Sequence, residues 1–116
     1  MKELDFIDEE FNVGDRVIVK GYDDMVREYG VYEFNKDIRC PKGYMTPFTY
    51  EMIRFCDKSG TVTDVFRDEY TGDTEIEIDF DDKSLNNNHY SFVDYMIEKD
   101  ILAGVTLPDA NGLYGF

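Results

Sequence analysis

The sequence predicts a mainly β fold with a few short helices, built as one domain within a chain of 116 residues. Short segments alternate apolar and polar side chains, as in TEIEIDF at residues 74–80, and this period of two is typical of strands with one buried face. Turns rich in Gly and Asp separate these segments. Helical spacing appears mainly between the first and second expected strands. Short strands, tight turns and a helix-bearing insertion together indicate a small, strongly bent barrel, and an SH3-like barrel fits this length.

The first strand is expected at RVIVK, directly after the turn signal Gly14-Asp15. Val17 and Val19 alternate there with charged and apolar neighbours. A clearer block comes later in the chain. It consists of a strand KSGTVTDVF, a hairpin turn EYTGD and a second strand TEIEIDF. A polar turn DDKSLNNN, a strand HYSFV and a helical turn with a short closing strand, DYMIEKDI, complete the expected sheet.

Two helices are expected between the first and second strands. Asp23 or Asp24 is predicted to cap a short helix that ends at Gly30, since Gly is the common stop after a helix. Residues 31–46 lack a period and are expected to form a long loop. A two-turn helix is then predicted to begin at Thr46-Pro47, with apolar residues recurring at Phe48, Met52 and Phe55 or Cys56.

The chain divides into three parts. Residues 1–10 are read as an acidic lead-in, 11–101 as the barrel domain, and 102–116 as a tail that is either ordered or flexible.

The composition and the alternation of side chains also predict the core. Apolar residues make up 42% of the chain, and with no Trp the nine Phe and nine Tyr must supply much of the packing. The expected core is Val17, Val19, Val62, Val65, Ile76, Ile78, Phe80, Phe92 and Met96.

Several motifs resemble those of a group of small proteins. The matching stretches are FNVGDRVIVKGYDDMVREYG, FTYEMIRFCDKSGTVTDV and YSFVDYMIE, which together span about residues 11–98. This pattern resembles short SH3-like barrel proteins encoded by phages and prophages of low-GC bacteria. The resemblance implies the fold and a phage or mobile-element origin. Since most such proteins have no assigned activity, it transfers no functional residue.

The charge of the chain narrows the classes of function. The net charge is −14, from 26 acidic and 12 basic residues. Such a protein repels nucleic acids and anionic membranes and attracts basic proteins. A local basic patch in the first 42 residues remains conceivable, from Arg16, Lys20, Arg27, Lys36, Arg39 and Lys42. No export signal or membrane span is expected, so the predicted location is inside the cell. The resemblance to phage-encoded proteins implies that this is the cytoplasm of a bacterial host cell.

Motifs for catalysis, metals and cofactors are weak, so the chain is expected not to be an enzyme and to hold neither metal nor cofactor. His89 has no nucleophile elbow near it, and Asp68–Asp73 departs from a calcium loop at Tyr70 and in the position of its Gly. Cys40 and Cys56 are read as reduced thiols, with Cys56 in the core and Cys40 more exposed and open to reaction. The carboxylates of the strand TEIEIDF are expected on its outward face with similar pKa values.

The row of acidic side chains leads to the principal hypothesis, a binding protein that masks a basic nucleic-acid-binding surface of a host protein. An inhibitor of a defence nuclease, of the anti-CRISPR or anti-restriction type and DNA-mimic-like, is its concrete form. The alternatives are that the charge serves solubility only, or that the chain is a general protein-interaction module using Tyr22, Tyr29, Tyr32, Tyr44 and Tyr90. The predicted partner-binding residues are Glu75, Glu77, Asp79, Asp81, Asp82, Asp64, Asp68 and Asp73.

Overall fold

A five-stranded antiparallel sheet forms the centre of the protein. In the computed structural model, which describes residues 10–86 and 90–100, the strands follow the order β4-β3-β2-β1-β5. Their bounds are β1 Arg16–Val19, β2 Ser59–Arg67, β3 Thr74–Phe80, β4 Phe92–Val93 and β5 Ile97–Lys99. The mainly β class predicted from the sequence is therefore confirmed.

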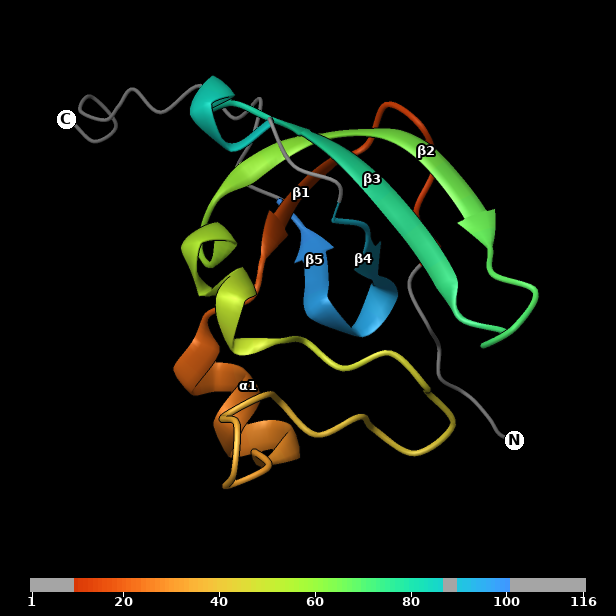
Figure 1. Cartoon of the computed structure of the whole chain (residues 1–116). Helices are drawn as coiled ribbons and strands as arrows, with labels where there is room; N and C mark the ends of the chain where they lie inside the picture. The colour runs from red at the N-terminus through yellow and green to blue at the C-terminus, as the bar shows by residue number, and fades with distance from the viewer. Residues whose placement is uncertain (1–9, 87–89, 101–116) are drawn as a thin grey trace, which may run out of the picture.

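The two edge strands of this sheet are neighbours in the chain. A 3-10 turn, η3 (Asp94–Met96), joins β4 to β5. The sheet bends so strongly that β2 and β3 arch over the other strands (Figure 1). No pairing between β4 and β5 is found among the described residues, so the sheet is curved but not closed.

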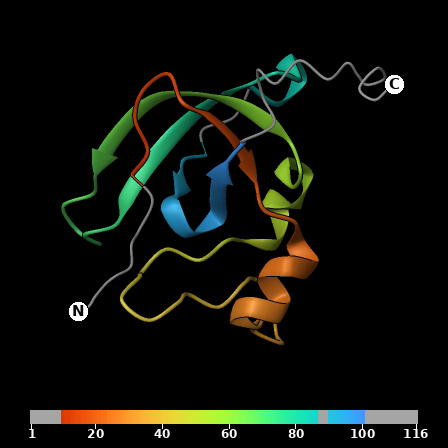
Figure 2. The ribbon, with the colours of Figure 1, turned by 180° about the vertical axis from the view of Figure 1, so that it is seen from behind.

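The segment between β1 and β2 covers the open side of the curved sheet, as the front and rear views show (Figures 1 and 2). It contains α1 (Tyr22–Tyr29), an irregular stretch and the 3-10 helix η1 (Tyr50–Phe55). A second short 3-10 helix, η2 (Lys83–Asn86), follows β3. The predicted loop at residues 31–46 is irregular, apart from the isolated bridges of Ile38 with Val31 and Phe48.

Both helix starts differ from the prediction. The N-cap of α1 is Gly21 and not Asp23 or Asp24. These two acids lie in the first turn, where their negative charges interact favourably with the positive end of the helix dipole. Gly30 ends this helix at φ 84°, as expected.

The second helix begins at Tyr50 and not at Thr46-Pro47, and it is a 3-10 helix of six residues. The carbonyl oxygen of Phe48 accepts a hydrogen bond of 2.8 Å from the backbone N–H of Ile38. This bridge uses Phe48 as extended backbone, and Thr49 continues it at φ −80° and ψ 156°. The helix therefore cannot start before residue 50.

The core lies between the sheet and this covering segment. Seven of the nine predicted core residues are buried, and Phe55, Phe80 and Phe92 form a cluster with ring centroids 5.3–5.7 Å apart. Val65 and Ile78 are only half-buried. The reason is pairing: β1 reaches β2 only as far as Thr61, and β4 pairs only with Glu75 and Ile76 of β3. The middle of the long β2–β3 hairpin thus lacks neighbouring strands.

Candidate functional site

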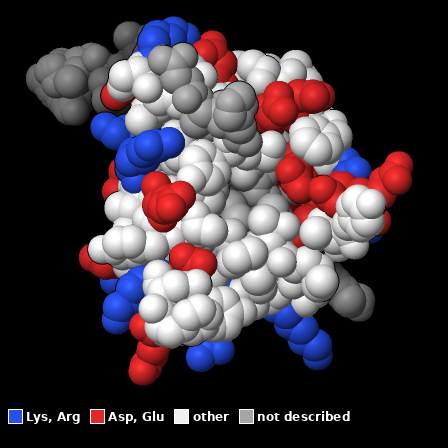
Figure 3. Space-filling model, in the orientation of Figure 1, with Lys and Arg blue, Asp and Glu red and all other residues white. Residues whose placement is uncertain are grey.

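The predicted acidic row lies on the outer face of the β2–β3 hairpin. Glu75, Glu77 and Asp79 alternate with the inward residues of β3, as the sequence indicated. The strand register places Glu77 opposite Asp64 and Glu75 opposite Phe66. Acidic side chains gather on the side of the molecule where this hairpin lies (Figure 3).

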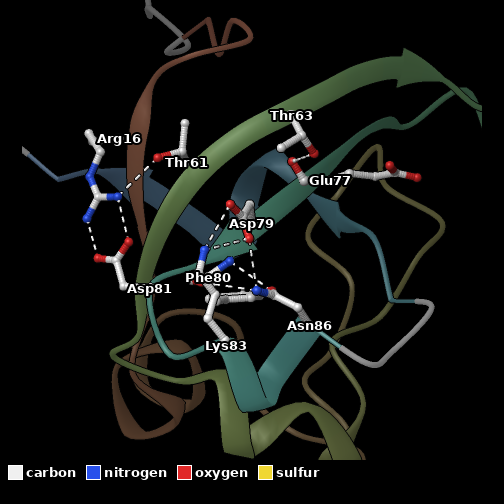
Figure 4. Close-up of polar contacts among 9 residues, drawn as sticks. All are labelled: Arg16, Thr61, Thr63, Glu77, Asp79, Phe80, Asp81, Lys83 and Asn86. Atoms are coloured by element: carbon white, nitrogen blue, oxygen red, sulfur yellow. Dashed lines mark hydrogen bonds and ion pairs between the residues drawn. The ribbon is translucent and has the colours of Figure 1, made fainter.

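Asp64 and Glu77 form the centre of this surface. Both are exposed, and they are direct cross-strand partners. Neither side chain has an ion-pair partner among the described residues. The side chain of Glu77 points away from the neighbouring ion pairs (Figure 4). Because facing like charges on a sheet destabilise it, this pair is retained at a cost in free energy.

At the end of β3 that leads into η2, the acids of the predicted row are already neutralised by basic residues. Arg16 donates to both carboxylate oxygens of Asp81, with Nη1 2.8 Å from Oδ1, and holds the pKa of Asp81 below its usual range. Lys83 lies 3.1 Å from Asp79, whose carboxylate also accepts a bond of 2.8 Å from Asn86 (Figure 4). Neither acid is a free negative charge.

Three further predicted residues have local structural roles. Asp82 accepts hydrogen bonds from the backbone N–H and the hydroxyl of Ser84 at the start of η2. Asp68 accepts from the backbone N–H groups of Tyr70 and Thr71 in the hairpin turn. The prediction that Asp73 extends the exposed row is wrong, because Asp73 is only 3% exposed. Its Oδ2 accepts a hydrogen bond of 3.0 Å from the backbone N–H of Met45.

The pKa values of Glu75 and Asp68, two carboxylates of the hairpin, are shifted in opposite directions. Burial raises the pKa of Glu75, and the nearby carboxyl of Asp68 raises it further. The backbone N–H groups of Thr71 and Tyr70 lower the pKa of Asp68. Glu75 therefore gains a proton before Asp68 as the pH falls.

Apolar side chains are interleaved with these acids, a feature that the charge pattern alone did not reveal. Phe66 is 38% exposed on the outer face, and Tyr70 at the hairpin tip is 99% exposed. Met45, whose backbone N–H donates a hydrogen bond to Asp73 of the hairpin, also has an exposed side chain. Aromatic side chains and Met are enriched at surfaces that bind proteins.

The tyrosines named for the alternative hypothesis are largely engaged within the fold. Tyr29 and Tyr44 pack edge-on against Tyr95, and the hydroxyl of Tyr44 donates to Asp94 at 2.6 Å. Tyr22 donates to the carbonyl of Lys36. These rings are structural, and among the described residues the exposed aromatic side chains are others: Phe34, Tyr50, Phe66 and Tyr70.

Several of the basic residues of the conceivable patch are likewise occupied. Arg16 pairs with Asp81, Lys20 with Glu28 and Arg27 with Asp24. Arg39 stacks over the ring of Tyr32, with 4.9 Å between its guanidinium carbon and the ring centroid. These contacts disfavour a nucleic-acid site built from the first 42 residues.

The thiols and carboxylates offer little reactive chemistry. Cys40 and Cys56 are free, and burial raises the pKa of both, to about 11 for Cys56. This opposes formation of the nucleophilic thiolate and makes a reactive Cys40 unfavourable. His89, the lead-in residues 1–9 and the tail lie outside the described residues.

In residues 10–86 and 90–100, which the structure describes, no group of three or more Cys, His, Asp or Glu side chains is placed to hold a metal ion. No helix in this described part of the chain is long and apolar enough to cross a membrane.

Two open pockets lie beside the helices that cover the sheet. One, of about 670 Å³, lies against α1 and contains the ion pair between Asp24 and Arg27. The other, of about 460 Å³, lies between the rings of Tyr50 and Tyr90 and is also lined by Asn35, Asp37, Thr49 and Glu51.

Comparison of the chain with protein-family models, with curated proteins and with solved structures gave no significant match.

Proposed function

We propose that the chain is a non-enzymatic acidic binding protein, encoded by a phage or another mobile element, that covers the basic nucleic-acid-binding surface of a host protein. Its most concrete form is a DNA-mimic-like inhibitor of a defence nuclease, of the anti-CRISPR or anti-restriction type. The fold it would use is an SH3-like barrel. The strand order β4-β3-β2-β1-β5, with a 3-10 turn between the edge strands, supports that assignment.

One observation carries the proposal: the facing carboxylates of Asp64 and Glu77, exposed and without an ion-pair partner among the described residues. A hairpin that needed only solubility could place its charges apart or pair them. Holding two like charges opposite each other destabilises the strand pair, and a cationic partner would remove that repulsion on binding. Phe66 adds apolar contact area on the same face.

The surface that we propose is smaller than the row the sequence indicated. It consists of Asp64, Glu77, Glu75 and Phe66 on the strands, with Asp68 and Tyr70 at the turn. Asp79 and Asp81 lie at its edge, where their own cations reduce their pull on a partner. Asp73 is excluded from it by burial.

The test is a pull-down from bacterial lysate with the immobilised protein, eluted first by duplex DNA and then by a salt gradient. We expect a nucleic-acid-binding protein that DNA displaces and salt releases. The immobilised Asp64→Lys/Glu77→Lys variant should no longer capture this nucleic-acid-binding protein. Glu33→Lys/Glu98→Lys, which changes two exposed acids elsewhere and shifts the net charge equally, should retain it. Capture that survives the hairpin reversal, or that DNA does not displace, contradicts the proposal.

A second candidate is a general interaction module that binds a peptide or subunit through exposed aromatic side chains. The observation in its favour is that Phe34 and Tyr70 are 85% and 99% exposed. In that case binding should resist salt and should fail in Phe66→Ala/Tyr70→Ala or Phe34→Ala variants. The salt gradient of the same pull-down separates the two candidates.

A further inference from the structure

A pocket with two aromatic rings and two carboxylates lies outside the hairpin surface. It is open to solvent, has a volume of about 460 Å³ and is formed by Asn35, Asp37, Thr49, Tyr50, Glu51 and Tyr90. These residues come from three separate parts of the chain: the irregular segment after α1, the start of η1 and the approach to β4. Its composition suits a ligand that is positively charged and flat.

Both rings of this pocket are held in place by other rings. The edge of Tyr22 meets Tyr50 with 5.9 Å between centroids and 83° between planes. Tyr50 is nevertheless 53% exposed, so it retains surface for a ligand. Phe55 holds Tyr90 in the same way, at 5.6 Å and 67°. Rings fixed in this way lose little conformational freedom when a ligand binds.

The two carboxylates of the pocket are also held in position. The backbone N–H of Tyr50 donates to Asp37 Oδ1 at 2.7 Å, and Asn35 donates to Oδ2 at 3.0 Å. The hydroxyl of Tyr90 donates to Glu51 Oε1 at 2.8 Å. Each oxygen can accept a second hydrogen bond. Neither Asp37 nor Glu51 has an ion-pair partner in the described part of the chain.

The protein already places a guanidinium on one of these rings. The guanidinium carbon of Arg54 lies 5.7 Å from the centroid of Tyr90 and 4.9 Å from that of Phe55. The pocket beside α1 offers a contrast, because there Arg27 already pairs with Asp24. None of the described residues that line the Tyr50–Tyr90 pocket is basic, so its two carboxylates have no such cation beside them there.

We propose that this pocket binds the guanidinium of an arginine side chain presented by a partner protein. A guanidinium is planar, stacks on tyrosine and can donate two parallel hydrogen bonds to a carboxylate. Lysine carries its charge at a point and cannot stack in this way. The site shares no residue with the hairpin surface, so it holds or fails independently of the proposed masking function.

The test is an NMR titration of the whole protein with N-acetyl-arginine amide. Saturable shifts are expected at the backbone amides of Asp37, Tyr50 and Glu51 and at Tyr90, with a dissociation constant of about 1 mM, as suits so small a ligand. The citrulline analogue has the same shape without the charge and should bind about tenfold more weakly. The lysine analogue should fall between them. Absence of these shifts, or equal binding of citrulline, overturns the proposal.

Two variants with matched controls complete the test. Glu51→Gln keeps an acceptor for Tyr90 and removes the charge, and Tyr50→Leu removes an exposed ring; each should weaken arginine binding about tenfold. Glu77→Gln and Tyr70→Leu make the same changes outside the pocket and should bind as the unaltered protein does. The variant spectra report folding directly. Equal loss in the controls, or unchanged binding in the pocket variants, overturns the proposal. Asp64→Lys/Glu77→Lys should still bind arginine, which separates this site from the hairpin.

Discussion

At the scale of single residues, Gly60 shows how one position permits two strands to lie close together. It pairs with Val17 on one side and with Phe80 on the other. A Cβ added at Gly60 would lie 2.5 Å from the Cγ2 of Ile78 and 2.6 Å from the carbonyl oxygen of Asp79. Real Cβ atoms do not approach backbone so closely, so only Gly lets β2 pair with β3 at this position.

Gly60→Ala should therefore destabilise the fold by about 3 kcal/mol, since overpacking of a buried site commonly costs 1–3 kcal/mol and backbone cannot yield easily. Urea unfolding followed by circular dichroism measures this. Gly43→Ala is the control, because Gly43 has φ 95° and open space around it, so only backbone strain of about 1 kcal/mol is expected. Equal losses in the two variants would show that the contact with β3 is not the cause.

Asp73 illustrates a charged residue whose sequence context is misleading. It follows the hairpin turn among exposed acids, yet it is buried and bonds the N–H of Met45. Asp73→Ala would leave that N–H without an acceptor, at a cost of about 1–3 kcal/mol. Asp73→Asn keeps an acceptor oxygen and should cost less. The two free energies of unfolding, compared in urea, test whether the hydrogen bond or the charge matters.

Glu75 gives the hairpin a dependence on pH. Its folded-state pKa lies above the unfolded value, so the folded state binds this proton more tightly. The stability that this provides is fully present below the unfolded pKa and is lost as the pH rises through the raised folded pKa. Glu75→Gln should thus be more stable than the unaltered protein at pH 7 and should lose that advantage below about pH 4. Thermal unfolding at both pH values measures it; an advantage that grows in acid would contradict the assignment.

At the scale of elements, the β2–β3 hairpin combines a structural cost with the proposed function. Asp64→Lys or Glu77→Lys alone converts facing like charges into an opposite pair, and each should stabilise the protein by about 0.2–1 kcal/mol. The double reversal restores repulsion and should lose that gain. A double-mutant cycle of unfolding free energies isolates this coupling. A coupling of zero would mean that solvent already screens the pair, and the argument from tolerated repulsion would fail.

The strands could be predicted from the sequence because their signal is local. The alternation in TEIEIDF gives β3 from Thr74 to Phe80 without error. The start of η1 could not, because a distant contact sets it: the bridge from Ile38 to Phe48 delays η1 to Tyr50. For the same reason the sequence placed Glu77 on the outer face but could not show that Arg16, 65 positions away, neutralises Asp81.

At the scale of the whole molecule, the net charge of −14 acts on folding and on binding together. Five ion pairs between described residues use basic side chains locally, among them Lys99 with Asp15 across the sheet. Exposed pairs contribute about 0–1 kcal/mol each. The remaining acids repel one another over distances that salt screens, with a Debye length of about 10 Å at 0.1 M. Self-repulsion should therefore exceed what the ion pairs contribute.

Raising NaCl from about 0.02 to 0.5 M should then increase the free energy of unfolding, because screening relieves the repulsion more than it weakens the ion pairs. Urea unfolding across this range measures the effect, and Glu33→Lys/Glu98→Lys, with fewer net charges, should show a shallower slope. The same salt should release a basic partner from the hairpin. Partner release while the fold becomes more stable would mean that salt acts on the interface itself. A fold that weakens with salt would instead show that the ion pairs dominate, and salt elution would then not distinguish dissociation from unfolding.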